Sequence, residues 1–187
     1  MDHTSQIVEN ASKIDGWMQY EELQWLAQKA SQKKVIIEIG CWQGRSTKAL
    51  TASSGVIYAI DPWNLHKKVE KTMHYSPNQL YEIFCSNLKA EIQACQVIPI
   101  RAPSQEAVEV LKKQDVLADM IFIDGDHSYQ GVKDDINNYF PFLAPGGLLC
   151  GHDYYSEEGV VRAVNEFIGY RQTYVTQNNQ IWFWDKK

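Results

Sequence analysis

The sequence lacks the marks of several large classes of protein. Its net charge is −5, which argues against broad, sequence-independent binding to nucleic acid because such binding needs a cationic surface. No apolar run approaches the length of a membrane span, and the sequence contains no internal repeat or low-complexity segment. The four cysteines form no C-x-x-C pair, so we expect free thiols, buried in the case of Cys41 and Cys150.

The beginning of the sequence also lacks a secretory pattern, because MDHTSQIVEN has no basic stretch followed by an apolar one. We therefore expect a protein of the reducing cytoplasm with no membrane partner. What is present is an ordinary globular composition, 44% hydrophobic and 22% charged, over 187 residues. This length suits a single domain, residues 1–187, with a core of its own.

Strand-like and helix-like segments alternate five times along the sequence. Apolar runs predict strands at 35–39, 56–60, 97–100, 120–123 and 148–150. Each precedes a segment of helical pattern, the last at 157–168, and residues 173–176 and 181–184 predict a closing hairpin. Residues 145–147, Pro-Gly-Gly, predict a turn. The alternation predicts an α/β fold, in which helices cover both faces of a mostly parallel sheet.

Residues 1–33 are expected to form a helical cover over this core. Trp17, Met18 and Tyr20 are expected to pack in the core, with a place over a bound ligand as the alternative. The cover is predicted from an apolar stripe at helical spacing. The residues of this stripe are Leu23, Leu26, Ala27 and Ala30.

Residues 62–80 show no clean periodicity and contain two histidines, a tryptophan and a tyrosine. A loop of this length in a compact domain is usually functional or mobile. We predict that it forms a lid over the acceptor of a reaction.

The stretch 35–47, VIIEIGCWQGRST, predicts a strand that turns through glycines into a helix. Such a turn can hold a small ligand, because glycines allow a close approach of the backbone and a helix N-terminus attracts anions. The spacing here is Gly-x-x-x-Gly, after Glu38, rather than the G-x-G-x-x-G of dinucleotide sites. The alternative is an ordinary connection between a strand and a helix.

Asp61 follows the second predicted strand, about twenty residues after the glycine loop, where doubly wound folds place a carboxylate on a ribose. Trp63 could stack on an adenine, and Ser104 is a candidate N-cap of the helix after the third strand. The alternative for Asp61 is an ordinary acid at the end of a strand.

Polar residues lie at the carboxyl end of each predicted strand. Ligands in parallel sheets bind beyond the carboxyl ends of the strands, so this convergence predicts a binding site there. The residues concerned are Glu38, Asp61, 101–104, 124–127 and 152–153. By contrast, Asp126 and the pair Asp134 and Asp135 are expected to be solvated.

Five sequence blocks together resemble the class I S-adenosylmethionine (SAM)-dependent methyltransferases over nearly the whole chain. They are residues 38–47 (EIGCWQGRST), 61–63 (DPW), 123–129 (IDGDHSY), 145–147 (PGG) and 151–154 (GHDY). The resemblance implies a three-layer Rossmann-like fold with a seven-stranded sheet, whose last hairpin supplies one antiparallel strand. It also implies a SAM-binding site that includes Glu38, Gly40, Trp42, Gly44, Ser46, Asp61, Trp63, Ser104 and Asp124.

Within this site the resemblance implies that Gly40, Gly44 and Ser46 hold the amino-acid half of SAM. Glu38 would lie near the ammonium, Asp61 on the ribose and Ser104 beside the adenine.

A more distant resemblance to metal-dependent O-methyltransferases implies a divalent ion on Asp124, His152 and Asp153. A bound cation would lower the pKa of an acceptor hydroxyl and orient it. Position 152 is histidine where an acid or amide is usual, and an imidazole with two carboxylates suits Mn or Zn better than Mg.

Without a metal, His127 or His152 would be the general base, with Asp124 as a further catalytic group, because imidazole titrates near neutral pH. The alternative is that His127 only forms a hydrogen bond within its turn and that His152 orients Asp153.

The sequence thus predicts a SAM-dependent methyltransferase that acts on an oxygen of a small molecule or glycosyl acceptor. The alternatives are a non-catalytic SAM-binding or scaffold protein and, less favoured, an NAD(P)-dependent oxidoreductase, which the missing second glycine of G-x-G disfavours. The acceptor and the oligomeric state stay open, a homodimer being compatible with the sequence.

Overall fold

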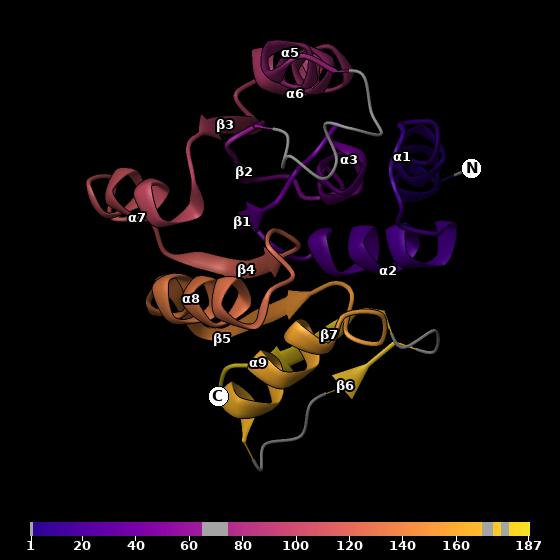
Figure 1. The fold of residues 1–187 in the computed structure, drawn as a ribbon. Helices are drawn as coiled ribbons and strands as arrows, with labels where there is room; N and C mark the ends of the chain where they lie inside the picture. The colour runs from indigo at the N-terminus through magenta and orange to yellow at the C-terminus, as the bar shows by residue number, and fades with distance from the viewer. Residues whose placement is uncertain (1, 65–74, 170–173, 177–179) are drawn as a thin grey trace.

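The structure is a computed structural model that describes residues 2–64, 75–169, 174–176 and 180–187. Strands and helices alternate along the chain as predicted (Figure 1). The helices are α1 (His3–Ser12), α2 (Tyr20–Ala30), α3 (Arg45–Leu50), α5 (Pro77–Asn87), α6 (Lys89–Gln93), α7 (Ser104–Lys112), α8 (Tyr129–Tyr139) and α9 (Glu158–Ile168), with a 3-10 turn at Phe140–Phe142. The strands are β1 (Val35–Ile39), β2 (Val56–Asp61), β3 (Val97–Arg101), β4 (Ala118–Ile123), β5 (Leu143–Gly151), β6 (Tyr174–Val175) and β7 (Trp182–Asp185).

Within the described residues, seven strands form one sheet in the order β3-β2-β1-β4-β5-β7-β6. The first five strands pair in parallel, whereas β7 is antiparallel to both β5 and β6. The strand order reverses between β1 and β4, which is where open α/β sheets bind their ligands. The predicted α/β class and the closing hairpin are confirmed.

Alternate residues of each central strand point to opposite faces of the sheet, and each face is buried. On one face Ile36 and Met120 pack under α1, α2, α3 and α5. On the other face Ile37 and Ile121 pack under α7, α8 and α9. Strands buried on both faces are expected to be apolar, and β1 and β4 are so at every position except Glu38 and Asp119. The thiols of Cys41 and Cys150 are free and buried, as predicted.

The N-terminal cover is confirmed for its helical stripe but not for its aromatic residues. All four residues of the stripe in α2 are fully buried, and Met18 is only 4% exposed, as predicted for a core residue. Trp17 and Tyr20 are 62% and 43% exposed, so the prediction that they pack in the core is wrong. No helix in the described part of the chain is long and apolar enough to cross a membrane.

The predicted lid, residues 62–80, differs from the structure at its end. Its central part, 65–74, lies outside the described residues. The helix expected from residue 81 begins earlier, at Pro77, because Ser76 and Gln79 form a capping box. Residues 77–80 are therefore helical rather than part of a loop.

The turn predicted at Pro145-Gly146-Gly147 is instead part of β5. The N–H of Gly146 donates to the carbonyl of Lys186 (2.8 Å), and the N–H of Lys186 donates to that of Gly147 (2.9 Å). Pairing with the residue after β7 therefore keeps the segment in the sheet. The prediction of a turn is therefore wrong, and the pairing of β4 with β5 shifts its register between Ala118 and Met120.

Candidate functional site

The loops at the carboxyl ends of the central strands are held together by backbone hydrogen bonds. The N–H of Gly40, after β1, donates to a carbonyl of β2 (2.9 Å). The N–H of Asp124, after β4, donates to a carbonyl of β1 (2.8 Å), and that of His152, after β5, to one of β4 (3.1 Å). The predicted polar residues of these loops are thus brought to one edge of the sheet.

The glycine loop after β1 needs its glycines for the packing of the protein itself. Gly40 (φ +84°) and Gly44 (φ +91°) lie in the left-handed region. A Cβ on Gly40 would lie 2.1 Å from the carbonyl oxygen of Asp124, and one on Gly44 would lie 2.3 Å from a methyl carbon of Leu88. The glycines are therefore explained without a ligand, and other residues must carry the argument for a binding site.

Asp61, at the end of β2, closes this loop with its carboxylate. One oxygen accepts the N–H groups of Cys41 (2.9 Å) and Trp42 (3.0 Å), and the other accepts that of Trp63 (2.6 Å). Burial raises the pKa of Asp61, and these three N–H groups act in the opposite direction. A carboxylate has about four acceptor positions, so capacity for one further donor is left. The ribose contact stays a prediction, beside a loop-closing role that the sequence did not indicate.

Trp63 is fully buried, so the prediction that it stacks on an adenine is wrong. Its ring centroid lies 4.9 Å from that of Tyr81 and 4.7 Å from that of Phe84, both on α5. Its indole N–H donates to the carbonyl of Trp42 (2.8 Å). Trp63 therefore fastens the glycine loop to α5.

Glu38 is fully buried within β1, beneath the start of α3. The hydroxyl of Ser46 donates to its Oε1 (2.6 Å), whereas Oε2 has no hydrogen-bond partner among the described residues. Burial raises the pKa of Glu38 to about 7, and the Ser46 hydrogen bond opposes this rise. A buried carboxylate oxygen without a partner is costly, and a cationic ligand group would satisfy it.

The N-terminal segment is fastened to the same loop by Arg45, which the sequence analysis missed. The Arg45 guanidinium donates to three carbonyls in and after the end of α1, at 2.6, 2.7 and 2.9 Å. The exposed ring of Trp17 lies 5.2 Å from that of Trp42, between ring centroids. Trp17 is thus placed beside the loop, as the alternative expectation of a ligand cover requires. Every residue has a backbone carbonyl, so no sequence pattern indicates the hydrogen bonds of Arg45.

Ser104 begins α7 rather than capping it, since the N-cap is Pro103. Its carbonyl accepts the hydroxyl of Tyr139 (2.7 Å). Asp135, expected to be solvated, is only 2% exposed, and its Oδ1 has no hydrogen-bond partner in the described part of the chain. Burial raises the pKa of Asp135 to about 6, opposed by the Ser104 side chain. The contact of Ser104 with an adenine stays a prediction.

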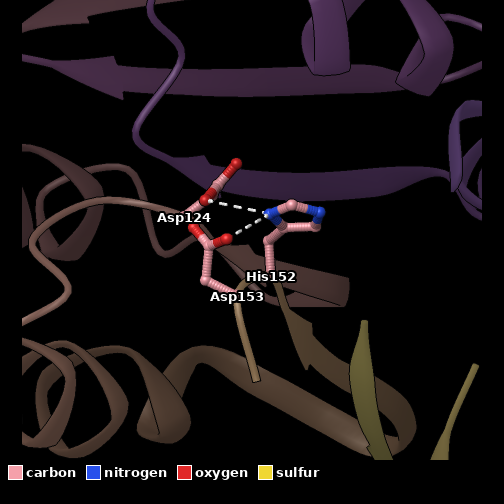
Figure 2. Close-up of side chains that lie close together, drawn as sticks. All are labelled: Asp124, His152 and Asp153. Atoms are coloured by element: carbon pink, nitrogen blue, oxygen red, sulfur yellow. Dashed lines mark ion pairs between the residues drawn. The ribbon is translucent and has the colours of Figure 1, made fainter. Parts of the chain in front are cut away.

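Asp124 follows β4, and His152 and Asp153 follow β5; the three side chains converge (Figure 2). Nδ1 of His152 lies 3.3 Å from Oδ1 of Asp153 and 3.9 Å from Oδ1 of Asp124. One potential ligand atom from each residue lies within 4.8 Å of those of the other two. The structure thus brings together the three residues predicted as metal ligands, and their donor set could hold a divalent ion.

His152 carries a positive charge in this arrangement. Burial alone would lower its pKa, but the contacts with the carboxylates of Asp153 and Glu22 and the charge of Asp124 outweigh burial and raise the pKa to about 10. For Asp153, burial would raise the pKa, but the two histidines bring it below its usual value. The cluster is therefore a compact group of opposite charges.

His127 lies at the open side of the cluster. Its Nε2 is 3.1 Å from Oδ2 of Asp153 and 3.7 Å from Oδ1 of Asp124, and its side chain is 40% exposed. Asp124 raises the pKa of His127, against the effect of burial. His152 is only 7% exposed, so a ligand reaches His127 more easily. The contact with Asp124 also agrees with the alternative role of His127 within its own turn.

Glu22 of α2 is a further member of the cluster that the sequence analysis missed. It is 2% exposed, and its Oε2 lies 3.4 Å from Nε2 of His152. The same oxygen accepts the N–H of Gln19 (2.6 Å), as part of a capping box. The capping pattern is visible in the sequence, but the contact with His152 depends on how α2 packs on the sheet.

The fold and the site can now be compared with known proteins. A curated relative, an uncharacterized protein R132 from Acanthamoeba polyphaga mimivirus, is 40% identical over 53 residues. The matched segment covers 27% of this chain and 24% of the viral protein, so the chain matches about a quarter of that relative's length.

Solved structures match almost the whole chain at low identity. A Staphylococcus aureus protein named as a candidate caffeoyl-CoA O-methyltransferase has a TM-score of 0.69 at 18% identity, and covers 100% of this chain and 93% of its own. The O-methyltransferase of Bacillus cereus, solved with SAH, has a TM-score of 0.66 at 18% identity (100% and 92% covered). TomG of Streptomyces achromogenes, an O-methyltransferase of tomaymycin synthesis solved with SAM, has a TM-score of 0.68 at 15% identity (100% and 91% covered).

At these identities the structural neighbours establish the fold, which is that of class I methyltransferases. A family model described as "Methyltransferase domain" matches residues 37–154, which is more than half of the chain. This segment runs from β1 to the loop after β5 and so includes the glycine loop, Asp61 and the cluster of Asp124, His127, His152 and Asp153. The chain therefore belongs to this methyltransferase-domain family.

Proposed function

We propose that this protein transfers the methyl group of SAM to a hydroxyl oxygen of a small molecule or glycosyl acceptor. The observation that carries the proposal is the position of His127, whose side chain is 40% exposed beside Asp124 and Asp153, the residues that follow β4 and β5. The structural neighbours are O-methyltransferases by name, which supports an oxygen acceptor. SAM supplies an activated methyl group, so the protein has to position the acceptor, remove its proton and exclude water.

The residues at the ends of β1 and β2 fit SAM. The unpartnered, buried Oε2 of Glu38 suits the ammonium of its amino-acid half. Asp61 retains acceptor capacity for a ribose hydroxyl and holds the loop against which the ligand would lie. Ser46 orients Glu38 through its hydroxyl. Ser104 is the proposed contact of the adenine.

His127 is the general base of this proposal. Its imidazole is the most accessible of the candidate bases, and Asp153 accepts from its Nε2 when that nitrogen is protonated. Asp124 lies 3.7 Å from the same nitrogen, and the two aspartates stabilise the imidazolium that forms after proton removal. His152, buried behind them, orients the two aspartates rather than meeting the acceptor.

A divalent ion fits the same cluster, and Asp124, His152 and Asp153 would hold it. The donor set of one imidazole and two carboxylates favours Mn²⁺ or Zn²⁺ over Mg²⁺. When bound, the ion would lower the pKa of an acceptor hydroxyl.

Incubation of the protein with methyl-labelled SAM and a panel of small hydroxyl and glycosyl compounds tests the proposal. We expect label in one class of acceptor and stoichiometric formation of SAH. A parallel series with a chelator decides between the two versions: lost activity that Mn²⁺ restores supports the ion, and full activity excludes it. A protein that binds SAM but methylates no member of the panel would favour the non-catalytic alternative.

A further inference from the structure

We propose that Glu22, in the first turn of α2, is a positioning residue of the candidate site: it holds Nε2 of His152 and thereby turns Nδ1 toward Asp124 and Asp153. The proposal rests on the proposed function, because it assigns Glu22 a role in arranging that site. Glu22 lies outside residues 37–154, the segment that the family model matches.

The first step of the argument is the position of the two ring nitrogens. Figure 2 shows Nδ1 of His152 facing both aspartates, with the other nitrogen on the far side of the ring. That second nitrogen, Nε2, has no hydrogen-bond partner among the described residues, and its contact with Glu22 is an ion pair, 3.4 Å from Oε2. Both side chains are buried, at 2% and 7% exposure, so water does not take the place of either partner.

The second step is that Glu22 is fixed independently of His152. Its Oε2 accepts the N–H of Gln19 (2.6 Å) in the capping box of α2. The next residue, Leu23, is fully buried in the core and holds the first turn of the helix on the sheet. The position of the Glu22 carboxylate is therefore set by α2, and the imidazole of His152 orients toward it.

The third step is the chemistry of the imidazole ring. A neutral imidazole has one N–H donor and one acceptor nitrogen, and the neighbours of the ring decide which is which. Here each ring nitrogen faces a carboxylate, Nε2 that of Glu22 and Nδ1 those of the aspartates. Glu22 therefore fixes how the ring is turned, and Nδ1 is the nitrogen that faces the aspartates. Carboxylates behind a ligating histidine orient it in this way in metal sites.

The experiment uses the full chain, with Glu22→Gln as the test variant. Glutamine at this position also completes a capping box, so the change removes the charge but keeps the cap of α2. The matched control is Glu21→Gln, which removes an exposed charge from the same turn. Glu22→Asp is a second test variant, because it keeps the charge but shortens the reach to His152.

Three measurements are made on each variant. They are the NMR signal of the His152 ring N–H at Nε2, the affinity for Mn²⁺ alone by electron paramagnetic resonance, and the affinity for SAH by calorimetry. We expect the ring signal in the wild type and in Glu21→Gln, and its shift or loss in Glu22→Gln and Glu22→Asp. Mn²⁺ binding should weaken about 10–100-fold in these two variants, the usual effect of losing such a partner, with SAH affinity unchanged.

A Glu22→Gln protein with a wild-type ring signal and wild-type Mn²⁺ affinity would overturn the proposal and leave Glu22 as a helix cap only. If the wild type binds no Mn²⁺, the ring signal alone decides in the same sense. If no variant binds SAH, the proposed function fails, while the ring signal still decides the role of Glu22. Should Glu22→Gln not fold, the same outcomes are read from Glu22→Asp.

Discussion

The two halves of the candidate site are built in different ways. After β1 and β2, buried side chains and backbone N–H groups hold one another at 2.6–3.0 Å. After β4 and β5, ionisable side chains face one another at 3.1–3.9 Å. The first half is thus fixed by folding, whereas the second consists of charges whose partners can change when a ligand or ion arrives. A site that binds a constant cofactor and converts an acceptor needs both kinds of construction.

This contrast predicts that substitutions in the first half lower the stability of the protein, whereas substitutions in the second half lower turnover and leave stability unchanged. Gly40→Ala is the severest test of the first half. A Cβ there would lie 2.1 Å from a backbone oxygen at a positive φ, so we expect a loss of more than about 3 kcal/mol of stability in thermal unfolding.

The matched control for this change is Gly146→Ala. Gly146 also has a positive φ, but its added Cβ meets nothing within 4 Å, so the cost should be about 1 kcal/mol. Equal stability of the two variants would show that the close approach at Gly40 is not rigid.

His127→Asn tests the second half. With an acceptor from the panel, turnover should fall by about 10²–10³-fold, because the general base is lost. SAH affinity and the melting temperature should stay those of the wild type, since the side chain is 40% exposed and outside the core. An equal loss of turnover and of SAH affinity would make His127 a binding residue instead.

Asp61→Asn probes the link between loop and ligand. An amide nitrogen cannot accept a hydrogen bond, so the variant loses one of the two oxygens that accept backbone N–H groups. It also loses the negative charge that would strengthen a hydrogen bond from a ribose hydroxyl. SAH affinity measured by calorimetry should fall at least tenfold, on the scale of about 1.5–3 kcal/mol for a charge-assisted hydrogen bond. Unchanged affinity would refute both roles of Asp61.

Asp135→Asn is expected to stabilise the protein. Burial raises the pKa of Asp135 from 3.8 to about 6, so the folded state binds a proton more tightly than the unfolded state. Stability therefore declines as the pH rises through this window, and the penalty is complete about one pH unit above the folded pKa. The amide should remove a penalty of about 3 kcal/mol at pH 7.5 and have little effect at pH 4, in thermal unfolding at both values.

Asp134→Asn is the control for this change, since its carboxylate lies at the surface with Gln130 and should have little influence at either pH. A melting temperature of Asp135→Asn below that of the wild type at pH 7.5 would contradict the account.

Glu38 predicts a smaller effect, on the pH dependence of cofactor binding. Its pKa is about 7, and an ammonium of the ligand favours the carboxylate form. SAH affinity should therefore rise by about tenfold between pH 6 and pH 8, as the ionised fraction rises. Glu38→Gln should bind more weakly and lose this dependence. A slope that persists in the variant would assign it to another group.

The fold could be predicted from the sequence because its strands are buried on both faces. Runs such as 35–39 and 120–123 are apolar at almost every position, and five of them alternate with helical patterns. Local pattern failed where a distant partner decided the structure. Residues 145–147 read as a turn, but pairing with Lys186 holds them in β5.

The site could be predicted in part, for a related reason. Polar residues at strand ends converge because parallel strands end at one edge, so the sequence predicts that Asp61, Asp124 and His152 lie at that edge, and their roles stay predictions. The function of Trp63 was misjudged, since an aromatic residue near a ligand loop gives no sign of whether its faces are already covered. Glu22 and Arg45 were missed because their contacts bridge residues far apart in the chain.

The central claim is that the loop from Gly40 to Gly44, closed by Asp61, is the cradle of an adenosyl ligand. Calorimetric titration of the wild-type protein with SAH, with NAD as the comparison, tests it most directly. The account predicts saturable binding of one SAH per chain and no heat from NAD. Absence of SAH binding at millimolar concentration, or binding of NAD in its place, would contradict it.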